Sequence, residues 1–135
     1  MRTAAAALGT ALLLGACAAP TACPPGTTPA ALAEAIFGRN RDGALRVSEA
    51  DWDRFLAEEV TPRFPDGLTV LDARGQWRGA DARPEREPAK LLLLVLPGTT
   101  PAEAAARLEP VAAAYRTRFD QESVLRVLQQ GCAAF

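Results

Sequence analysis

The chain has 135 residues, 49% of them hydrophobic, with 15 basic and 16 acidic side chains. This size and composition predict one compact domain rather than a disordered chain or a multidomain enzyme. Because the charges nearly balance, no net field attracts nucleic acid, and we expect no nucleic-acid partner. The chain lacks His, which excludes His-based acid–base catalysis, Ser-His-Asp triads and His-ligated metal sites. It also has no Gly-rich phosphate loop, so we expect neither a metal nor a cofactor.

The N-terminal residues are typical of a secretory signal. Arg2 provides a positive charge, and residues 4–14 form an apolar run of the length that such signals use. The run is too short to span a bilayer, which takes roughly 20 apolar residues. The residues at its end, Leu14-Gly15-Ala16-Cys17, resemble the lipobox of bacterial lipoproteins, in which the cysteine is acylated and becomes the mature N terminus. This resemblance implies that residues 1–16 are a signal peptide and that Cys17 carries the lipid.

The segment after the signal predicts where the protein is held. Several acyl chains on Cys17 would anchor it stably to a membrane, whereas a single chain binds reversibly. Ala18 follows the cysteine instead of Asp, which is similar to lipoproteins sorted to the outer membrane. Residues 17–29 are rich in Ala, Pro, Thr and Gly and are predicted to form a flexible spacer. We expect a lipid-anchored protein of the cell envelope, on the outer membrane and facing the periplasm, with residues 30–135 as its single domain.

Two helices have clear start signals. Ser48 followed by Asp51, and Thr100 followed by Glu103, have the spacing of capping boxes. Apolar residues recur at helical spacing after each of these caps. The second helix contains Pro110, which removes one backbone hydrogen bond and is expected to kink it.

The strands are marked less sharply. Residues 91–96 form an unbroken apolar run that predicts a buried, central strand. Residues 68–71 predict a second strand, with a turn or bulge signal at residues 72–75 that leads into residues 76–78. Residues 123–128 predict the last strand. Residues 31–37 suit a helix by composition and a strand by their short length, and we interpret them as a strand.

The order strand, helix, strand, strand, helix, strand predicts an α+β fold of the ferredoxin-like βαββαβ type. Such a fold has an antiparallel sheet with both helices on one face and the first and third strands in the middle. The apolar run at residues 91–96 places apolar side chains on both faces of the sheet, of which the helices cover one. We expect a homodimer to cover the other face, and the spacer and the loop at residues 79–88 are the alternatives.

The remaining cysteines, Cys23 and Cys132, are predicted to form a disulfide. An even pair in an oxidising compartment is more often a disulfide than a nucleophile. In the predicted fold the last strand runs antiparallel beside the first, which brings the two cysteines to the same end of the sheet.

Runs of residues between positions 31 and 128 carry a second resemblance. They lie at residues 37–39, 47–52, 61–70, 75–78, 86–90 and 115–124. These runs are similar to the family catalogued as domain of unknown function 3574. The resemblance implies a single-domain lipoprotein but brings no catalytic residues, because the family is itself uncharacterised.

Two polar groups are candidate binding sites, because loops held by a rigid sheet often carry binding residues. The first flanks the second and third strands and contains Arg63, Asp66, Gln76, Trp77, Arg78, Glu87 and Lys90. The second lies between the last helix and the last strand and contains Arg118, Gln121 and Ser123, beside Asp120 and Glu122. Arg beside an aromatic side chain suits an anionic or planar ligand. The alternatives are a turn at residues 63–67, a core Trp77, a surface ion pair of Glu87 with Lys90, and a solvated loop before the last strand.

Two hypotheses of function follow. The favoured one is a non-catalytic envelope module that binds a small ligand or an envelope partner through its sheet and loops. The alternative is a small cofactor-free enzyme, oxygenase-like or isomerase-like, whose cleft forms on dimerisation. The absence of His weighs against the enzyme, although a carboxylate such as Glu87 could act as a general base.

Overall fold

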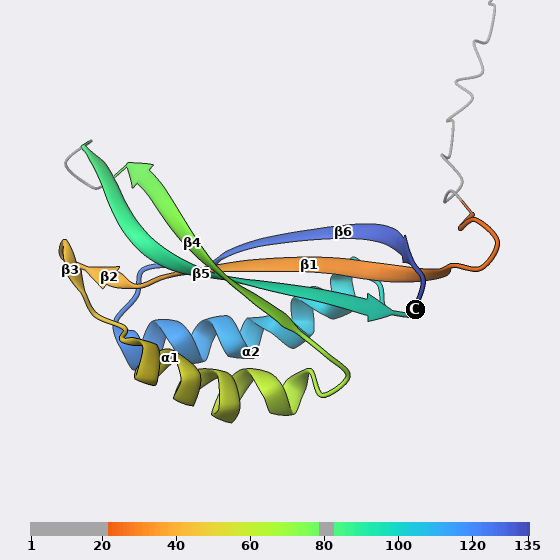
Figure 1. The fold of residues 1–135 in the computed structure, drawn as a ribbon, viewed down its shortest axis with the longest axis horizontal. Helices are drawn as coiled ribbons and strands as arrows, with labels where there is room; N and C mark the ends of the chain where they lie inside the picture. Colours follow the sequence, from red (N-terminus) through yellow and green to blue (C-terminus); the bar gives the residue numbers. More distant parts are fainter. Residues whose placement is uncertain (1–21, 79–82) are drawn as a thin grey trace, which may run out of the picture.

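The computed structural model describes residues 22–78 and 83–135, so residues 1–16 and Cys17 lie outside the described part. One antiparallel sheet has the strand order β4-β5-β1-β6. Its strands are β1 (Thr28–Gly38), β4 (Thr69–Arg78), β5 (Pro84–Pro97) and β6 (Leu125–Ala133). Two α-helices, α1 (Glu49–Phe55) and α2 (Pro101–Phe119), lie on one face of it (Figure 1). The predicted ferredoxin-like α+β fold is therefore confirmed, with β1 and β5 in the middle.

Short elements complete the chain. The strands β2 (Asn40–Arg41) and β3 (Ala44–Leu45) form a small hairpin directly after β1. The π-helix η1 (Leu56–Val60) and the 3-10 helix η2 (Thr61–Arg63) extend α1 towards β4. α1 and its extensions therefore carry the chain from one end of the sheet to the other (Figure 1).

Both helices begin where their capping boxes predict. The Ser48 hydroxyl accepts from the backbone N–H of Asp51 over 3.1 Å, and the Asp51 carboxylate accepts from the backbone N–H of Ser48. Thr100 and Glu103 make the same reciprocal pair at the start of α2. α2 then continues through Pro110 to Phe119.

The sheet corrects three of the expected boundaries. Residues 72–75 lie inside β4, where we expected a turn or bulge, and β5 already begins at Pro84, inside the loop expected at residues 79–88. β4 and β5 pair in register from Thr69 opposite Leu93 to Arg78 opposite Pro84. Ladder pairing over this length outweighs the local turn preference of the residues between. β1 and β6 are likewise longer than expected, because they pair from Thr28 opposite Ala133 onwards.

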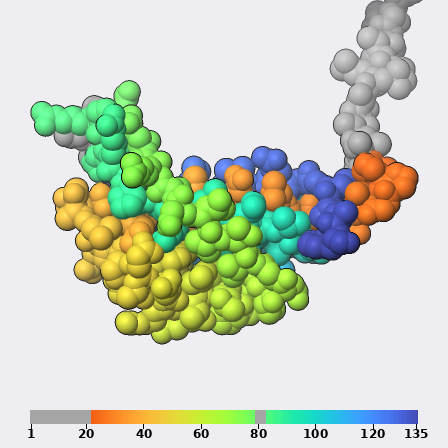
Figure 2. All heavy atoms as spheres, in the orientation of Figure 1, coloured from red at the N-terminus to blue at the C-terminus, as the bar shows by residue number. Residues whose placement is uncertain are grey.

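The far end of the β4–β5 hairpin forms an arm. β1 pairs with β5 only as far as Gly38 opposite Ala89, so residues 74–78 and 84–88 pair with each other alone. Figures 1 and 2 show this arm rising clear of the domain, on the side of the sheet opposite the helices. An isolated two-stranded ribbon is only marginally stable in water. A partner or ligand that packs against the arm would therefore stabilise it.

The core lies between the sheet and the helices. Alternate residues of β1 from Ala31 to Phe37 are fully buried against α1 and α2. Their aromatic neighbours pack mostly edge to face, with Phe37 and Tyr115 ring centroids 4.8 Å apart. The members of this aromatic cluster are Phe37, Trp52, Phe55, Tyr115 and Phe119.

The opposite face of the sheet, which we call the open face, is also largely apolar. Its residues alternate with the buried ones and are aligned by the strand register. They are Leu32, Glu34, Ile36, Thr69, Leu71, Ala73, Leu91, Leu93, Val95, Leu125, Val127 and Gln129. Several of the large apolar members are more than one-third exposed, as the apolar run at residues 91–96 predicts.

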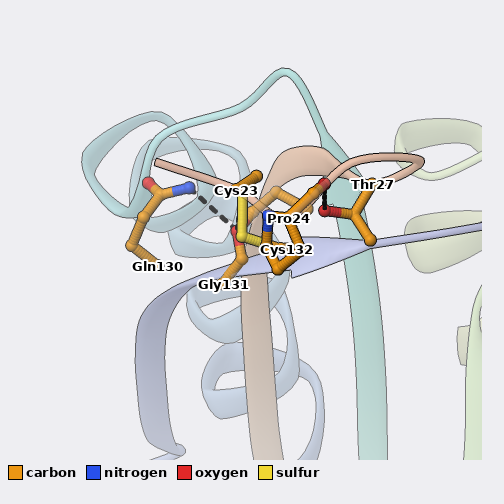
Figure 3. Close-up of a disulfide and its surroundings, with 7 residues drawn as sticks. Cys23, Pro24, Thr27, Gln130, Gly131 and Cys132 are labelled. Atoms are coloured by element: carbon orange, nitrogen blue, oxygen red, sulfur yellow. Dashed lines mark hydrogen bonds between the residues drawn. A yellow bond between two sulfur atoms is a disulfide. The ribbon is translucent and has the colours of Figure 1, made fainter. Parts of the chain in front are cut away.

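The predicted disulfide between Cys23 and Cys132 is confirmed. It joins the segment before β1 to the end of β6, with 5.7 Å between the two Cα atoms (Figure 3). Nearby, the Gln130 amide donates to the backbone oxygen of Ala30 over 3.0 Å. The ordered domain therefore begins before residue 30, inside the segment that we expected to be spacer.

Candidate ligand-binding cleft

A cleft of about 400 Å³ lies where the arm, the end of β1 and the loop between α2 and β6 meet. It unites parts of both predicted groups: Gln76, Trp77 and Glu87 from the first, and Gln121 and Ser123 from the second. These positions are distant in sequence, and they meet because the end of β1 lies between the arm and the loop that leads into β6.

Glu87 is the best-positioned acidic side chain in the cleft. The backbone N–H of Asn40 donates to Glu87 Oε2 over 3.1 Å. A Cβ atom on Gly38 would lie 2.6 Å from Glu87 Oε1, so only Gly leaves room for this carboxylate. The carbonyl of Gly38 is held from the helix side, because the Tyr115 hydroxyl donates to it over 2.8 Å. Burial raises the pKa of Tyr115, which keeps its hydroxyl protonated as a donor.

Trp77 forms part of the arm wall of the cleft. Its side chain is 43% exposed, so it does not belong to the core, which was one of the alternatives. Trp77 pairs in register with Glu85, and both side chains point to the cleft side of the arm. An indole face beside carboxylates suits a planar or cationic ligand.

The loop between α2 and β6 is held by hydrogen bonds to the backbone and by ion pairs with Arg41. Gln121 donates from Nε2 to the backbone oxygens of Asn40 and Phe119, over 3.0 and 3.3 Å. Asp120 ends α2 in the left-handed conformation, with φ of 54°. Its carboxylate and that of Glu122 each lie 3.3 Å from the Arg41 guanidinium. Gln121 therefore holds the cleft wall in place, and its amide nitrogen already donates hydrogen bonds to the backbone.

The charge of the cleft is negative. Among its described lining residues, Arg41 is the basic one, and the carboxylates belong to Asp42, Glu85, Glu87 and Glu122. Arg41 is already engaged with the loop carboxylates, which leaves Glu85 and Glu87 to set the potential near Trp77. Carboxylates that converge on a concave wall favour a cation and disfavour an anion. The expectation of an anionic ligand for the first group is therefore not supported at this position.

Two predicted residues of the first group lie at the other end of the domain. Arg63 ends η2 and pairs with Glu59, with 3.0 Å between the charged atoms, and Asp66 lies in the turn before β4. Arg118, from the second group, lies in the last turn of α2 and is not among the residues that line the cleft. It pairs with Glu58 and Glu59, and its guanidinium lies 5.5 Å from the Phe55 ring centroid. A ten-residue strand is roughly 30 Å long, so β4 separates Arg63 and Asp66 from the cleft. The expected grouping of Arg63 and Asp66 with the residues of the arm is therefore wrong.

Lys90 is buried on the helix side of the sheet and does not line the cleft. Its side chain is only 7% exposed, and Nζ donates to Glu49, over 2.6 Å, and to Asp72. Hydrogen bonds from Lys90 and Arg39 lower the pKa of Glu49, and Lys90 lowers that of Asp72. The alternative surface pair of Lys90 with Glu87 is wrong, because side chains an odd number of positions apart in a strand point to opposite faces.

Arg78 also lies outside the cleft. It alternates with Trp77 along β4 and pairs in register with Pro84, so it points to the outer side of the arm. The described residues contain no cluster of three His, Cys, Asp or Glu side chains suited to a metal ion. None of the described helices is long and apolar enough to cross a bilayer.

Sequence reasoning missed the groups that shape the cleft from the backbone. The amide of Asn40 and the missing side chain of Gly38 position Glu87, yet neither residue type signals a binding role by itself. Glu85 was missed because it lay in a presumed loop. Once β5 is known to begin at Pro84, alternation along the strand places Glu85 and Glu87 on the same side.

The fold and cleft define a small α+β domain of the ferredoxin-like class. A family model described as a protein of unknown function, DUF3574, matches residues 33–135, and the chain belongs to this family. No curated protein matches the chain in sequence.

Solved structures that are similar in fold include a phage enzyme and a cyanobacterial protein. A phage SAM lyase in complex with S-methyl-5'-thioadenosine has a TM-score of 0.61 and 14% identity, over 85% of this chain and 95% of that chain. CutA from Synechococcus elongatus PCC7942 has a TM-score of 0.51 and 7% identity, over 81% of this chain and 83% of that chain. At these identities the similarity concerns the fold alone.

Proposed function

We propose that the chain is a lipid-anchored protein of the cell envelope whose domain binds a small organic cation in the cleft. The observation that carries the cleft proposal is Trp77 and the carboxylates of Glu85 and Glu87 on one concave wall. A volume of about 400 Å³ falls within the range of small-molecule sites. An exposed indole attracts a cation through its π face by about 0.5–1 kcal/mol, and more when water is excluded.

The preformed position of Glu87 supports the same ligand class. Its carboxylate is already oriented by the Asn40 amide, so less ordering is needed when a cation binds. The phage lyase with its bound nucleoside suggests a suitable probe, because SAM combines a sulfonium cation with a planar base. S-adenosylhomocysteine is the matched neutral-sulfur control.

Tryptophan fluorescence tests this proposal. The chain has two tryptophans, and Trp52 is only 1% exposed, so a ligand in the cleft should change the signal of Trp77. We expect SAM to bind about tenfold more tightly than S-adenosylhomocysteine, and Glu87→Gln to remove most of this preference. Glu58→Gln removes an exposed carboxylate outside the cleft and is the control. Equal affinity for both probes would contradict a cation site, and no response to either would count against binding of this class.

The enzyme is the second candidate, favoured by one observation: the Glu87 carboxylate lies in the cleft at a position where it could accept a proton. Incubation of the chain with SAM distinguishes the enzyme from the binding module. Release of S-methyl-5'-thioadenosine from SAM, abolished by Glu87→Gln, would favour an enzyme. Binding without turnover would favour the binding module.

The lipid anchor is supported by the lipobox-like residues 14–17. We expect Cys17→Ser to move the protein from the membrane fraction to a soluble or unprocessed form, because the acylated side chain is lost. Fractionation followed by mass spectrometry of the N-terminal peptide measures both distribution and modification. An unmodified Cys17 in a chain that still fractionates with membranes would refute the anchor. Ala18→Asp tests the outer-membrane assignment, since we expect it to alter sorting but not lipidation.

A homodimer through the open face completes the proposal. Its support is the apolar surface that the helices leave uncovered, which includes Ile36 and Leu125 and continues into the cleft. A second copy on this face would shield the cleft from water on that side.

A further inference from the structure

The arm separates its charges by face. Along β4, Arg74, Gln76 and Arg78 alternate with Gly75 and Trp77. Gln76 borders the cleft as well, but it pairs in register with Arg86 of β5. Directly opposed residues of antiparallel strands share a face. Arg74, Arg78 and Arg86 therefore lie together on the outer side of the arm, which we call the arginine face. Trp77, Glu85 and Glu87 lie on the other side.

The arginine face has no acidic partner within the described part of the chain. Arg86 donates from Nε to the Gln76 side chain over 3.0 Å, and no described carboxylate pairs with Arg74, Arg78 or Arg86. All three side chains are exposed. In the body of the domain, most arginines pair with carboxylates, namely Arg39, Arg41, Arg63, Arg116, Arg118 and Arg126. Unpaired guanidinium groups are thus concentrated on the part of the sheet that projects furthest.

We propose that the arginine face binds the headgroups of anionic phospholipids. The planar guanidinium matches a phosphate with two parallel hydrogen bonds, and three such groups on one ribbon suit a surface that carries many phosphates. The inference that this surface is the protein's own membrane rests on the proposed lipid anchor.

Contact between the arm and the membrane would fix the orientation of the tethered domain. Cys17 lies five positions before Ala22, so the lipid is within about 18 Å of the chain at residue 22. That end of the sheet holds the disulfide, whereas the arm extends beyond the other end of β1, roughly 35 Å away. A single tether leaves a domain free to rotate. A second contact at the far end holds the domain in one orientation, and the tether raises its local concentration at the membrane.

Vesicle sedimentation tests the proposal with the chain from residue 18, which keeps every described residue. The vesicles contain either phosphatidylcholine alone or an equal mixture with phosphatidylglycerol. Each Arg near an anionic membrane contributes about a fivefold gain in binding, so three predict a preference of about a hundredfold for the anionic vesicles. Raising the salt from 0.1 to 0.5 M should remove most of it.

The decisive variant is the triple change Arg74→Gln, Arg78→Gln and Arg86→Gln, which should abolish the preference. The control removes the same charge from the body, through Arg46→Gln, Arg54→Gln and Arg116→Gln, and should keep it. Arg78→Glu is a milder alternative if circular dichroism shows that the triple variant is unfolded. Equal binding to both vesicle types, or equal loss in both triple variants, overturns the proposal. Stronger binding to soluble polyphosphate than to vesicles also overturns it, because the face would then bind another polyanion.

This assay is independent of the proposed anchor and cleft. Anionic vesicle binding by the unlipidated chain, together with an unmodified Cys17 in cells, would refute the anchor and leave the arginine face standing. Loss of cleft binding in Glu87→Gln leaves the vesicle result unchanged, since Glu87 lies on the other side of the arm.

Discussion

Removing the disulfide by the double change Cys23→Ser and Cys132→Ser is expected to lower the free energy of unfolding by about 4–5 kcal/mol in the chain-entropy model. The bond joins residues 109 positions apart, so it closes nearly the whole domain into one loop. Without it the unfolded chain gains conformational freedom, while the folded sheet keeps its pairing between β1 and β6. Denaturant unfolding followed by the fluorescence of the buried Trp52 measures the change.

Reduction is the matched control for this prediction. Dithiothreitol should destabilise the native chain by a similar amount and leave the double variant unaffected. Because the disulfide ties residue 23 to the end of β6, we also expect the first residues of β1 to become more accessible to proteases in the variant. Full reactivity of both thiols in the unreduced native chain would show that the bond does not form.

Local signals predicted the elements that depend on neighbours in sequence. Each capping box fixes a helix start through contacts between residues three positions apart, so Ser48 and Thr100 identify both helices. The disulfide could be predicted because a ferredoxin-like topology places the start of β1 beside the end of β6. In both cases the decisive contact follows from spacing or from strand order.

The arm could not be predicted from local signals. Residues 72–75 have the composition of a turn, yet they pair with β5 and stay extended. Alternate residues share a face only within a strand. Without the arm, the sequence therefore did not show that Arg74, Gln76 and Arg78 lie on one face. The net charge of the chain is nearly balanced, and a sum of charges does not show where they lie. The structure places negative charges in the cleft and positive charges on the arginine face, on the two sides of one hairpin.

The candidate site could be predicted only in part. Trp77, Glu87 and Gln121 were identified as polar or aromatic residues near strand ends, and the structure places all three around the cleft. Their chemical context depends on long-range contacts, such as that between Asn40 and Glu87, which are 47 positions apart. Arg63 was grouped with Trp77 and Glu87 because it precedes strand β4. It lies at the start of that strand, however, whereas the cleft lies at its other end.

The second large effect expected is a doubling of mass in solution. We expect the unlipidated chain from residue 18 to sediment as a dimer at tens of micromolar, because a second copy buries the open face. Four strands spaced by about 4.8 Å and paired over about nine residues give this face a footprint on the order of 600 Å². Stable interfaces begin at about the same area per partner. Two-fold symmetry closes such an assembly without leaving an apolar face uncovered.

Leu125→Glu on the open face should convert the dimer to a monomer, because it places a charge within the buried interface. Leu45→Glu is its matched control, since both leucines are 59% exposed and Leu45 lies on β3, away from the sheet. Glu34 is the charged side chain of the open face, and the dimer must bury it, so Glu34→Gln should tighten the association. A monomeric native chain that binds no hydrophobic dye would show that the domain tolerates its open face unaided. Dissociation by Leu45→Glu, with Leu125→Glu still dimeric, would instead place the interface on the β2–β3 hairpin.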